Sequence, residues 1–306
     1  MFDWSGVSAF TIPGFLENVR IMEYHSLIHP QMRTSLVDQK CQVSLSDSGK
    51  FSFGLHVRLV PSSVWKFIYY EYIHCRISAA RRLRLVFEED KPKEFPAAGS
   101  SASKLRTFVA TETGDCKNIQ SLFTNRNLRV LYLSGSSIQR LPASISKLRN
   151  LRYLNLSRCQ KLDALHDGLI NSLYKLQTLI LHDCCSLSEL PEDLGLMKNL
   201  RHLDVSYTGI AKFPESVTEL CDLQTLDVSH CKKFTELPEN IGAWKQLRSL
   251  NISHTEVSKL PVSITDLFKL EKLRLYYCPN LTALPRGMEG LSRLQKIDTS
   301  GTQIKE

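Results

Sequence analysis

The chain has 306 residues, and 42% of them are hydrophobic, which is enough for the core of one or two domains. The net charge is +8, but the basic residues are spread along the sequence and run closest together at Arg81, Arg82 and Arg84. This pattern argues against nucleic acid and membranes as partners. No apolar stretch reaches the roughly 18 residues of a membrane span, and the first residues lack the basic segment of a secretory signal.

Residues 1–75 show no repeat and stay unassigned, with partial disorder as one alternative. The aromatic-rich stretch at 65–74 suits either a helix or a strand. Residues 76–127 are predicted to form irregular entry repeats, with strands at 81–86 and 104–109 and a loop at 91–101 between them.

Residues 128–306 follow a regular frame, L-x-x-L-x-L-x-x-[C/T/S]. The segment from Leu151 to Cys159 is one example. Successive anchor leucines lie 23 to 25 residues apart, from Leu128 to Leu294. The last slot of the frame holds Ser136, Cys159, Cys184, Thr208, Cys231, Thr255, Cys278 and Thr302. A register kept over eight units is typical of a solenoid built from repeats.

Each L-x-L segment predicts a short strand, and successive strands should stack in parallel. The second half of the units reads L-P-x-x-[I/V/L], as at Leu141–Pro142 and Leu260–Pro261, except that His166 replaces the proline after Leu165; this pattern predicts a helical or 3₁₀ turn on the convex side. Stacking should bury each leucine against its neighbours. The Cys/Thr/Ser slot should point inward, where a small donor reaches a backbone carbonyl.

The final repeat, which ends at Glu306, is truncated before its Leu-Pro pair. A fragment, a shortened gene product or pairing through this end would each account for that. Four of the nine cysteines occupy the repeat slot, so their spacing follows the period. This favours reduced thiols in a cytoplasmic protein over a disulfide framework.

These units are leucine-rich repeats. The segments 127–148, 150–156 and 176–184 resemble the repeats of plant intracellular nucleotide-binding leucine-rich-repeat disease-resistance proteins. The resemblance implies an α/β leucine-rich-repeat solenoid with an irregular N-terminal region. It also implies recognition of a protein, namely a pathogen effector, a host protein under guard or a signalling protein.

The family's nucleotide-binding module is not recognisable in this sequence. No G-x-x-x-x-G-K-[S/T] loop occurs, because the segment 48–50 lacks the first glycine of that pattern. Residues 1–75 are also too few for the module. Nucleotide binding is therefore not carried over, and no cofactor is expected.

Side chains between the strand leucines should face away from the core, since strands alternate faces. Like positions on adjacent strands lie about 4.8 Å apart. We therefore expect Tyr207, His230, His254 and Tyr277 to form one row beside Asp204 and Asp227. Exposed aromatic side chains often anchor protein partners. The predicted concave contact site comprises Tyr207, His230, His254, Tyr277, Asp204, Asp227, Arg274 and Tyr276.

Chemical alternatives are weaker. A zinc site at His182, Cys184 and Cys185 is not expected, because Cys184 occupies the inward slot whereas His182 should face outward, so their side chains point apart. A nucleophile pair of Cys231 and His230 is not expected for the same reason. Asp204 and Asp227 on an open wall lack the enclosed pocket that acid–base catalysis needs. We predict a non-enzymatic recognition module acting in defence. A free-standing scaffold of the Ras-group repeat type and a ubiquitin-ligase adaptor remain as alternatives.

Overall fold

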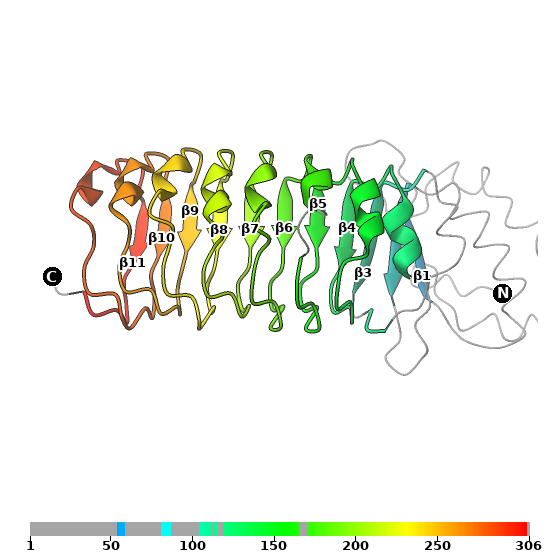
Figure 1. Cartoon of the computed structure of the whole chain (residues 1–306), viewed down its shortest axis with the longest axis horizontal. Coiled ribbons are helices and arrows are strands. Elements are labelled where there is room, and N and C mark those ends of the chain that lie inside the picture. The colour runs from blue at the N-terminus through cyan, green and yellow to red at the C-terminus, as the bar shows by residue number, and fades with distance from the viewer. Residues whose placement is uncertain are drawn as a thin grey trace, which may run out of the picture.

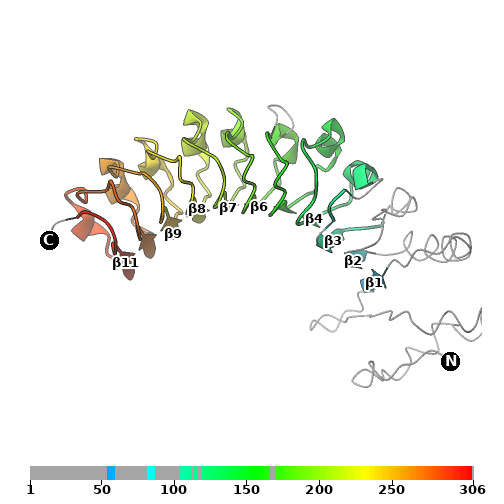
Figure 2. The same cartoon turned by 90° about the horizontal axis from the view of Figure 1, so that it is seen from below.

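The computed structural model describes residues 54–58, 81–86, 104–111, 113–115, 119–165 and 170–304. These residues form one elongated, curved array of repeats (Figure 1). Seen along the sheet edge, short strands line the inner side of the arc and 3₁₀ helices line its outer side (Figure 2). The solenoid predicted from the leucine frame is confirmed.

The described strands join in one parallel sheet, in chain order from β1 to β11. The predicted strands at 81–86 and 104–109 correspond to β2 and β3, and β1 falls in the segment that the sequence left unassigned. The strands are β1 (Gly54–Arg58), β2 (Arg82–Val86), β3 (Thr107–Thr111), β4 (Val130–Leu133), β5 (Tyr153–Asn155), β6 (Thr178–Ile180), β7 (His202–Asp204), β8 (Thr225–Asp227), β9 (Ser249–Asn251), β10 (Lys272–Arg274) and β11 (Lys296–Asp298).

The outer side carries short 3₁₀ helices, as the Leu-Pro segments predict. Pro142, Pro214 and Pro261 each precede one of them, with φ between −68° and −65°. That angle is the one the proline ring imposes, so the chain enters the turn already shaped for it. The helices are η3 (Ile119–Thr124), η4 (Ala143–Lys147), η5 (Ile170–Leu173), η6 (Leu194–Leu196), η7 (Glu215–Glu219), η8 (Ile241–Ala243), η9 (Val262–Asp266) and η10 (Met288–Gly290).

The core runs through the array as columns of like residues. Leu203, Leu226 and Leu250 are paired partners on adjacent strands, and each is at most 1% exposed. One repeat buries little apolar surface by itself, so stability comes from stacking on its neighbours. Burial of each such leucine contributes about 1.5–3 kcal/mol.

The Cys/Thr/Ser slot points inward, as expected, and its donors bond to backbone carbonyls. The Cys231 thiol donates to the Val205 carbonyl of the preceding repeat at 3.1 Å. The Thr208 hydroxyl donates to the same carbonyl, within its own repeat, at 2.7 Å. Cys278 and Thr255 share the Ile252 carbonyl in the same way. The slot thus fixes the point where each strand turns toward the outer side.

Cysteine repeats hold one more residue than threonine repeats between this slot and the next core residue. The segment from Cys231 to Phe234 closes its own turn, because the Phe234 amide donates to the Cys231 carbonyl. After Thr208, the Gly209 amide instead donates to the Leu187 carbonyl of the preceding repeat. The two local geometries explain why the repeat length alternates without loss of register.

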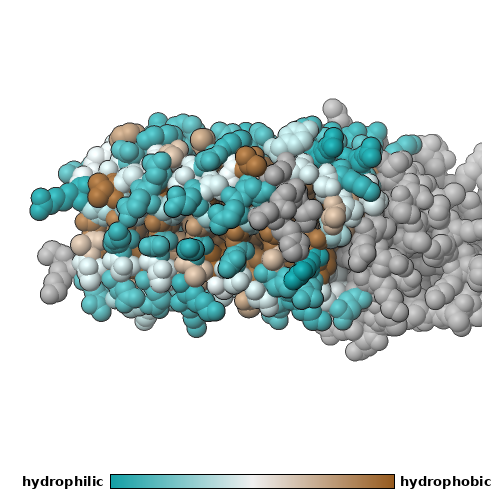
Figure 3. All heavy atoms as spheres, in the orientation of Figure 1, coloured by the Kyte–Doolittle hydropathy of each residue, from teal (hydrophilic) through white to brown (hydrophobic). Residues whose placement is uncertain are grey.

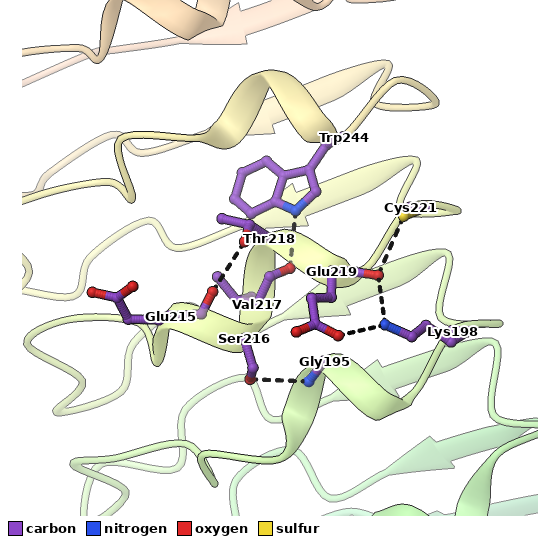
Figure 4. Close-up of polar contacts among 9 residues, drawn as sticks. All are labelled: Gly195, Lys198, Glu215, Ser216, Val217, Thr218, Glu219, Cys221 and Trp244. Carbon is purple, nitrogen blue, oxygen red and sulfur yellow. Dashed lines mark hydrogen bonds and ion pairs between the residues drawn. The ribbon is translucent and has the colours of Figure 1, made fainter.

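On the outer side, neighbouring 3₁₀ helices are tied by polar contacts (Figure 4). The Gly195 amide donates to the Ser216 hydroxyl, and the Lys198 amine contacts the Glu219 carboxylate at 2.6 Å. The buried Trp244 indole N–H donates to the Val217 carbonyl at 3.0 Å. Trp244 is therefore a core residue, as its apolar slot indicates.

The face seen in Figure 1 is mostly covered by hydrophilic side chains, with hydrophobic ones in a band along its middle (Figure 3). Within the described residues, the short helices never reach the length and apolarity that a membrane crossing demands.

Candidate partner-binding site

One residue of each repeat, three positions after the strand, adopts the left-handed conformation. Tyr207, His230, His254 and Tyr277 have φ of 57°, 61°, 58° and 53°. Each of these four amides donates to a carbonyl of the next repeat, as Tyr207 does to Ser229 at 2.9 Å. This interlock holds the residues in a conformation that side chains with a Cβ otherwise disfavour. The repeat backbone therefore fixes the spacing of the four side chains.

The rings of these four residues, here called the aromatic rail, stack on one another. Ring centroids lie 4.0 Å apart between Tyr207 and His230, 4.0 Å between His230 and His254, and 5.2 Å between His254 and Tyr277. The interplanar angles are 10°, 17° and 3° in the same order. The expectation that these residues share one row is confirmed.

Both ends of the rail are closed by further contacts. The ring of His182 meets Tyr207 edge-on at 5.2 Å. At the other end Gly301 packs against Tyr277, where an added Cβ would lie 3.2 Å from the ring. Tyr276 meets both Tyr277 and His254 edge-on. The ring faces thus contact neighbouring groups within the stack, and the ring edges are the parts that face solvent.

The two tyrosines are the exposed parts of the rail. Tyr207 is 43% exposed and Tyr277 is 53% exposed, whereas His230 and His254 are half-buried between them. Aromatic edges carry partial positive charge, and the tyrosine hydroxyls add donors. A partner that meets these edges gains most from carbonyl or hydroxyl oxygens.

The carboxylates of Asp204 and Asp227 lie beside the rail, but they also serve the fold. One oxygen of Asp204 accepts from the Ser206 amide at 3.0 Å and from its hydroxyl at 2.5 Å. Asp227 caps Ser229 in the same way, and its second oxygen accepts from Asn251 at 2.9 Å. Part of their hydrogen-bonding capacity is therefore used within the repeat.

The serines two positions after these acids are buried and do not face outward. The alternation of faces holds only inside the strand, and the chain turns inward immediately after it. The acid or amide of the strand then covers the serine, as Asn155 covers Ser157, and Asn155 itself is only 6% exposed. The buried serines are Ser134, Ser157, Ser206, Ser229 and Ser253.

The remaining predicted contact residues lie toward the C-terminal part of the sheet. Arg274 is exposed on β10, and Tyr276 is 39% exposed beside the rail. His182 was not among the predicted contacts, although its ring extends the row by one repeat. His182 precedes the rail slot of its own repeat by one position, so the sequence did not predict its contact with Tyr207. That edge-on contact depends on the direction in which the chain turns after the strand.

The surroundings of His230 in the rail lower the pKa of its imidazole. Burial lowers its pKa from the ordinary value, and the positive potential of His254 adds to that effect, while Asp227 opposes it. The rail is therefore set to hold a neutral imidazole at this position near pH 7.

Residues considered for zinc or nucleophilic chemistry diverge in space. Cys184 is fully buried and donates to the Leu156 carbonyl at 3.1 Å, whereas His182 pairs with the Ser206 hydroxyl. Burial raises the pKa of Cys184 to about 12, and it also raises that of Cys231. Over the described residues, no three acidic, cysteine or histidine side chains gather as a metal site.

The sheet, the outer 3₁₀ helices and the inward Cys/Thr slot together define a leucine-rich-repeat solenoid. Residues 127–235 match a family described as "Leucine-rich repeat region". The chain is similar to two solved folds, a TDR receptor (TM-score 0.61, 22% identity, 82% of this chain and 42% of that one) and the leucine-rich repeat domain of the type III effector XopL (TM-score 0.52, 22% identity, 78% and 83%).

In sequence, the repeats are similar to those of plant disease resistance proteins. Disease resistance protein RPS4 of Arabidopsis thaliana is 36% identical over 96 residues, or 31% of this chain and 8% of RPS4. TMV resistance protein N of Nicotiana glutinosa is 31% identical over 136 residues, or 42% of this chain and 12% of that protein. The chain thus matches about a tenth of the length of these relatives, and the similarity lies in its repeats.

Proposed function

We propose that the chain is a recognition module that binds a protein partner in the plant defence response, without catalysis, and that the aromatic rail is the centre of the contact surface. The single observation that carries this proposal is the continuous stack of Tyr207, His230, His254 and Tyr277. Such a stack is held rigid before any partner arrives, so little side-chain entropy is lost on binding.

The position of the rail supports recognition of a protein. The exposed tyrosines supply large, amphipathic contact area of the kind enriched at interface centres. Asp204, Asp227 and Arg274 add charges of both signs beside them. A partner with backbone carbonyls at the ring edges and basic groups near the two carboxylates would complement this surface.

We place this binding in the cytoplasm. The slot thiols of Cys159, Cys184, Cys231 and Cys278 are free, and each donates a hydrogen bond that requires the reduced form. Reducing conditions preserve that state. Similar repeats occur in plant disease resistance proteins. This similarity favours an effector, or a host protein that an effector alters, as the partner.

The test compares affinity capture from plant leaf extract by the full chain and by two double variants. Y207A/Y277A removes the exposed ends of the rail. Y174A/F268A removes two aromatic side chains that are 46% and 58% exposed but lie outside the rail. Captured proteins are quantified by mass spectrometry, and thermal unfolding confirms that both variants fold.

The proposal expects a protein that the wild-type chain and Y174A/F268A retain and that Y207A/Y277A loses by about tenfold or more, as for the loss of central aromatic contacts. Equal capture by all three chains contradicts the assignment of the rail. A captured protein lost only with Y174A/F268A would place the contact on the other aromatic residues.

A further inference from the structure

A second surface lies at the opposite ends of the strands, where one residue per repeat precedes each strand. The Arg106 amide donates to the Arg81 carbonyl at 2.7 Å, the Arg129 amide to Arg106 at 2.7 Å, and the Arg152 amide to Arg129 at 2.8 Å. Arginines 23 to 25 residues apart in sequence are thereby fixed one strand spacing apart. These four residues, Arg81, Arg106, Arg129 and Arg152, are here called the arginine row.

The row is exposed, and no acidic residue among those that the structure describes pairs with it. All four side chains are exposed, and none forms an ion pair with another residue of the described chain. Residues 104–165 contain eleven lysines and arginines and three acidic residues, so the net charge of this segment is +8, the same as that of the whole chain. Two of those acids, Asp115 and Asp163, already pair with Lys161 and Arg140.

The same column changes character farther along the solenoid. Beyond Arg152 the column holds Gln177, Arg201, Gln224, Arg248, Glu271 and Gln295. Arg201 is thus flanked by two glutamines, and Arg248 is paired with Glu271 at 3.0 Å. Consecutive arginines without an ion pair among the described residues thus occupy the repeats of β2 to β5, and Arg201 before β7 is a single further one, whereas the aromatic rail spans the repeats of β7 to β10. The two surfaces differ in edge, in position along the array and in chemistry.

We propose that the arginine row is a docking site for an acidic, extended segment of a protein partner. Guanidinium groups form paired hydrogen bonds with carboxylates, so a row of them suits successive Asp or Glu side chains. Three steps of about 4.8 Å give a row about 14 Å long, which an extended segment of four or five residues covers at about 3.3 Å each. The site is independent of the aromatic rail.

An acidic peptide suits this surface better than a nucleic acid does. Single-stranded nucleic acids are held by basic grooves with exposed aromatic platforms on which bases stack. Beside the row, the first residue of β4 is Val130, and Tyr153 of β5 is half-buried with its hydroxyl accepting from Asn155. The row therefore supplies charge without a stacking surface next to it.

The test measures binding of a fluorescein-labelled hexaglutamate peptide to the full chain by fluorescence anisotropy. R106Q/R129Q/R152Q removes three charges with the residue that the same column carries naturally at Gln177 and Gln224. K212Q/K233Q/R286Q is the control, because it removes three exposed charges elsewhere. An oligothymidylate with six phosphates is the competing probe, and thermal unfolding verifies folding of both variants.

We expect the peptide to bind the wild-type chain, and its Kd for the control variant to lie within about twofold of the wild-type value. Its Kd for R106Q/R129Q/R152Q should be about tenfold higher, because three exposed charge pairs are lost. Raising the salt concentration should weaken binding to the wild type. The inference fails if the peptide does not bind, if the arginine variant binds it equally well, or if the oligothymidylate binds more tightly through the same arginines. None of these outcomes depends on the rail.

Discussion

Thr208 and Cys231 lie in successive repeats, yet their side chains donate to the same oxygen, the carbonyl of Val205. The distances are 2.7 Å from the threonine hydroxyl and 3.1 Å from the thiol, and the two donors are themselves 3.3 Å apart. A buried carbonyl has two lone pairs, and this pairing uses both of them. The slot that reveals the repeat in the sequence is therefore also a joint between repeats.

Replacing Thr208 with valine tests this joint. The change keeps the shape of the side chain but removes one donor, so the free energy of unfolding should fall by about 1 kcal/mol. Chemical denaturation measures the difference. T235V, at an exposed position, is the control and should change stability by less than about 0.5 kcal/mol. Equal effects of the two changes would rule out the shared acceptor.

Replacing Gly195 with alanine tests the close approach of η6 and η7. An added Cβ would clash with the backbone carbonyl of Ser216, so we expect a loss of about 1–3 kcal/mol from overpacking. The matched control is G290A on η10, because nothing lies within 4 Å of a Cβ there. Thermal unfolding should separate the two variants. A neutral G195A would show that the helices are not packed this closely.

Replacing Leu226 with aspartate tests the phase of the whole repeat. Leu226 is 1% exposed between Leu203 and Leu250, so an unpaired carboxylate there should destabilise the array by more than about 4 kcal/mol. Loss of the cooperative melting transition would show this. K233D introduces the same group at an exposed site and should melt like the wild type. An unchanged transition for L226D would refute the assignment of the core column.

Alkaline pH tests the buried thiols. Burial raises the pKa of Cys159 to about 11 and that of Cys184 to about 12, against about 8.5 for an unfolded cysteine. The protonated thiol is thus favoured in the folded chain. Its contribution is complete below about pH 8.5 and is lost as the pH rises toward 11 and 12.

Urea unfolding between pH 8 and 11 measures this loss. C159S/C184S keeps two small donors that do not ionise in this range, and Ser136 already occupies the same slot. The wild type should therefore lose more stability than the variant, by an amount on the order of 2 kcal/mol for each thiol. Parallel pH profiles would contradict burial of these thiols in the protonated form.

The sequence predicts the solenoid well because its period sets one geometry for every repeat. The leucine anchors give the phase, and the phase places Tyr207, His230, His254 and Tyr277 in one row. The burial of Ser206 and Ser229 is not predictable in this way, because alternation of faces ends with the strand and the following turn depends on left-handed residues. Gly135 and Gly301 in that slot are the one local hint of the turn.

The arginine row was also hidden in the sequence. Its members are far apart in the chain, so a search for dense basic runs finds Arg81 together with Arg82 and Arg84 but none of the other three members. The repeat period that aligns the leucines also aligns Arg106, Arg129 and Arg152, and the charges add only once the strands are stacked. Charge should therefore be read by column in a solenoid, not by segment.

Site-specific photo-crosslinking tests the central role of the rail most directly. A benzophenone amino acid replaces Tyr277 in one chain and Phe268 in another, since the two side chains are 53% and 58% exposed. After irradiation in plant cells, we expect a covalent adduct with one discrete protein from position 277, lost when Tyr207 is also changed to alanine, and no such adduct from position 268. Absence of any adduct at 277, or the same adduct from both positions, would contradict partner binding at the aromatic rail.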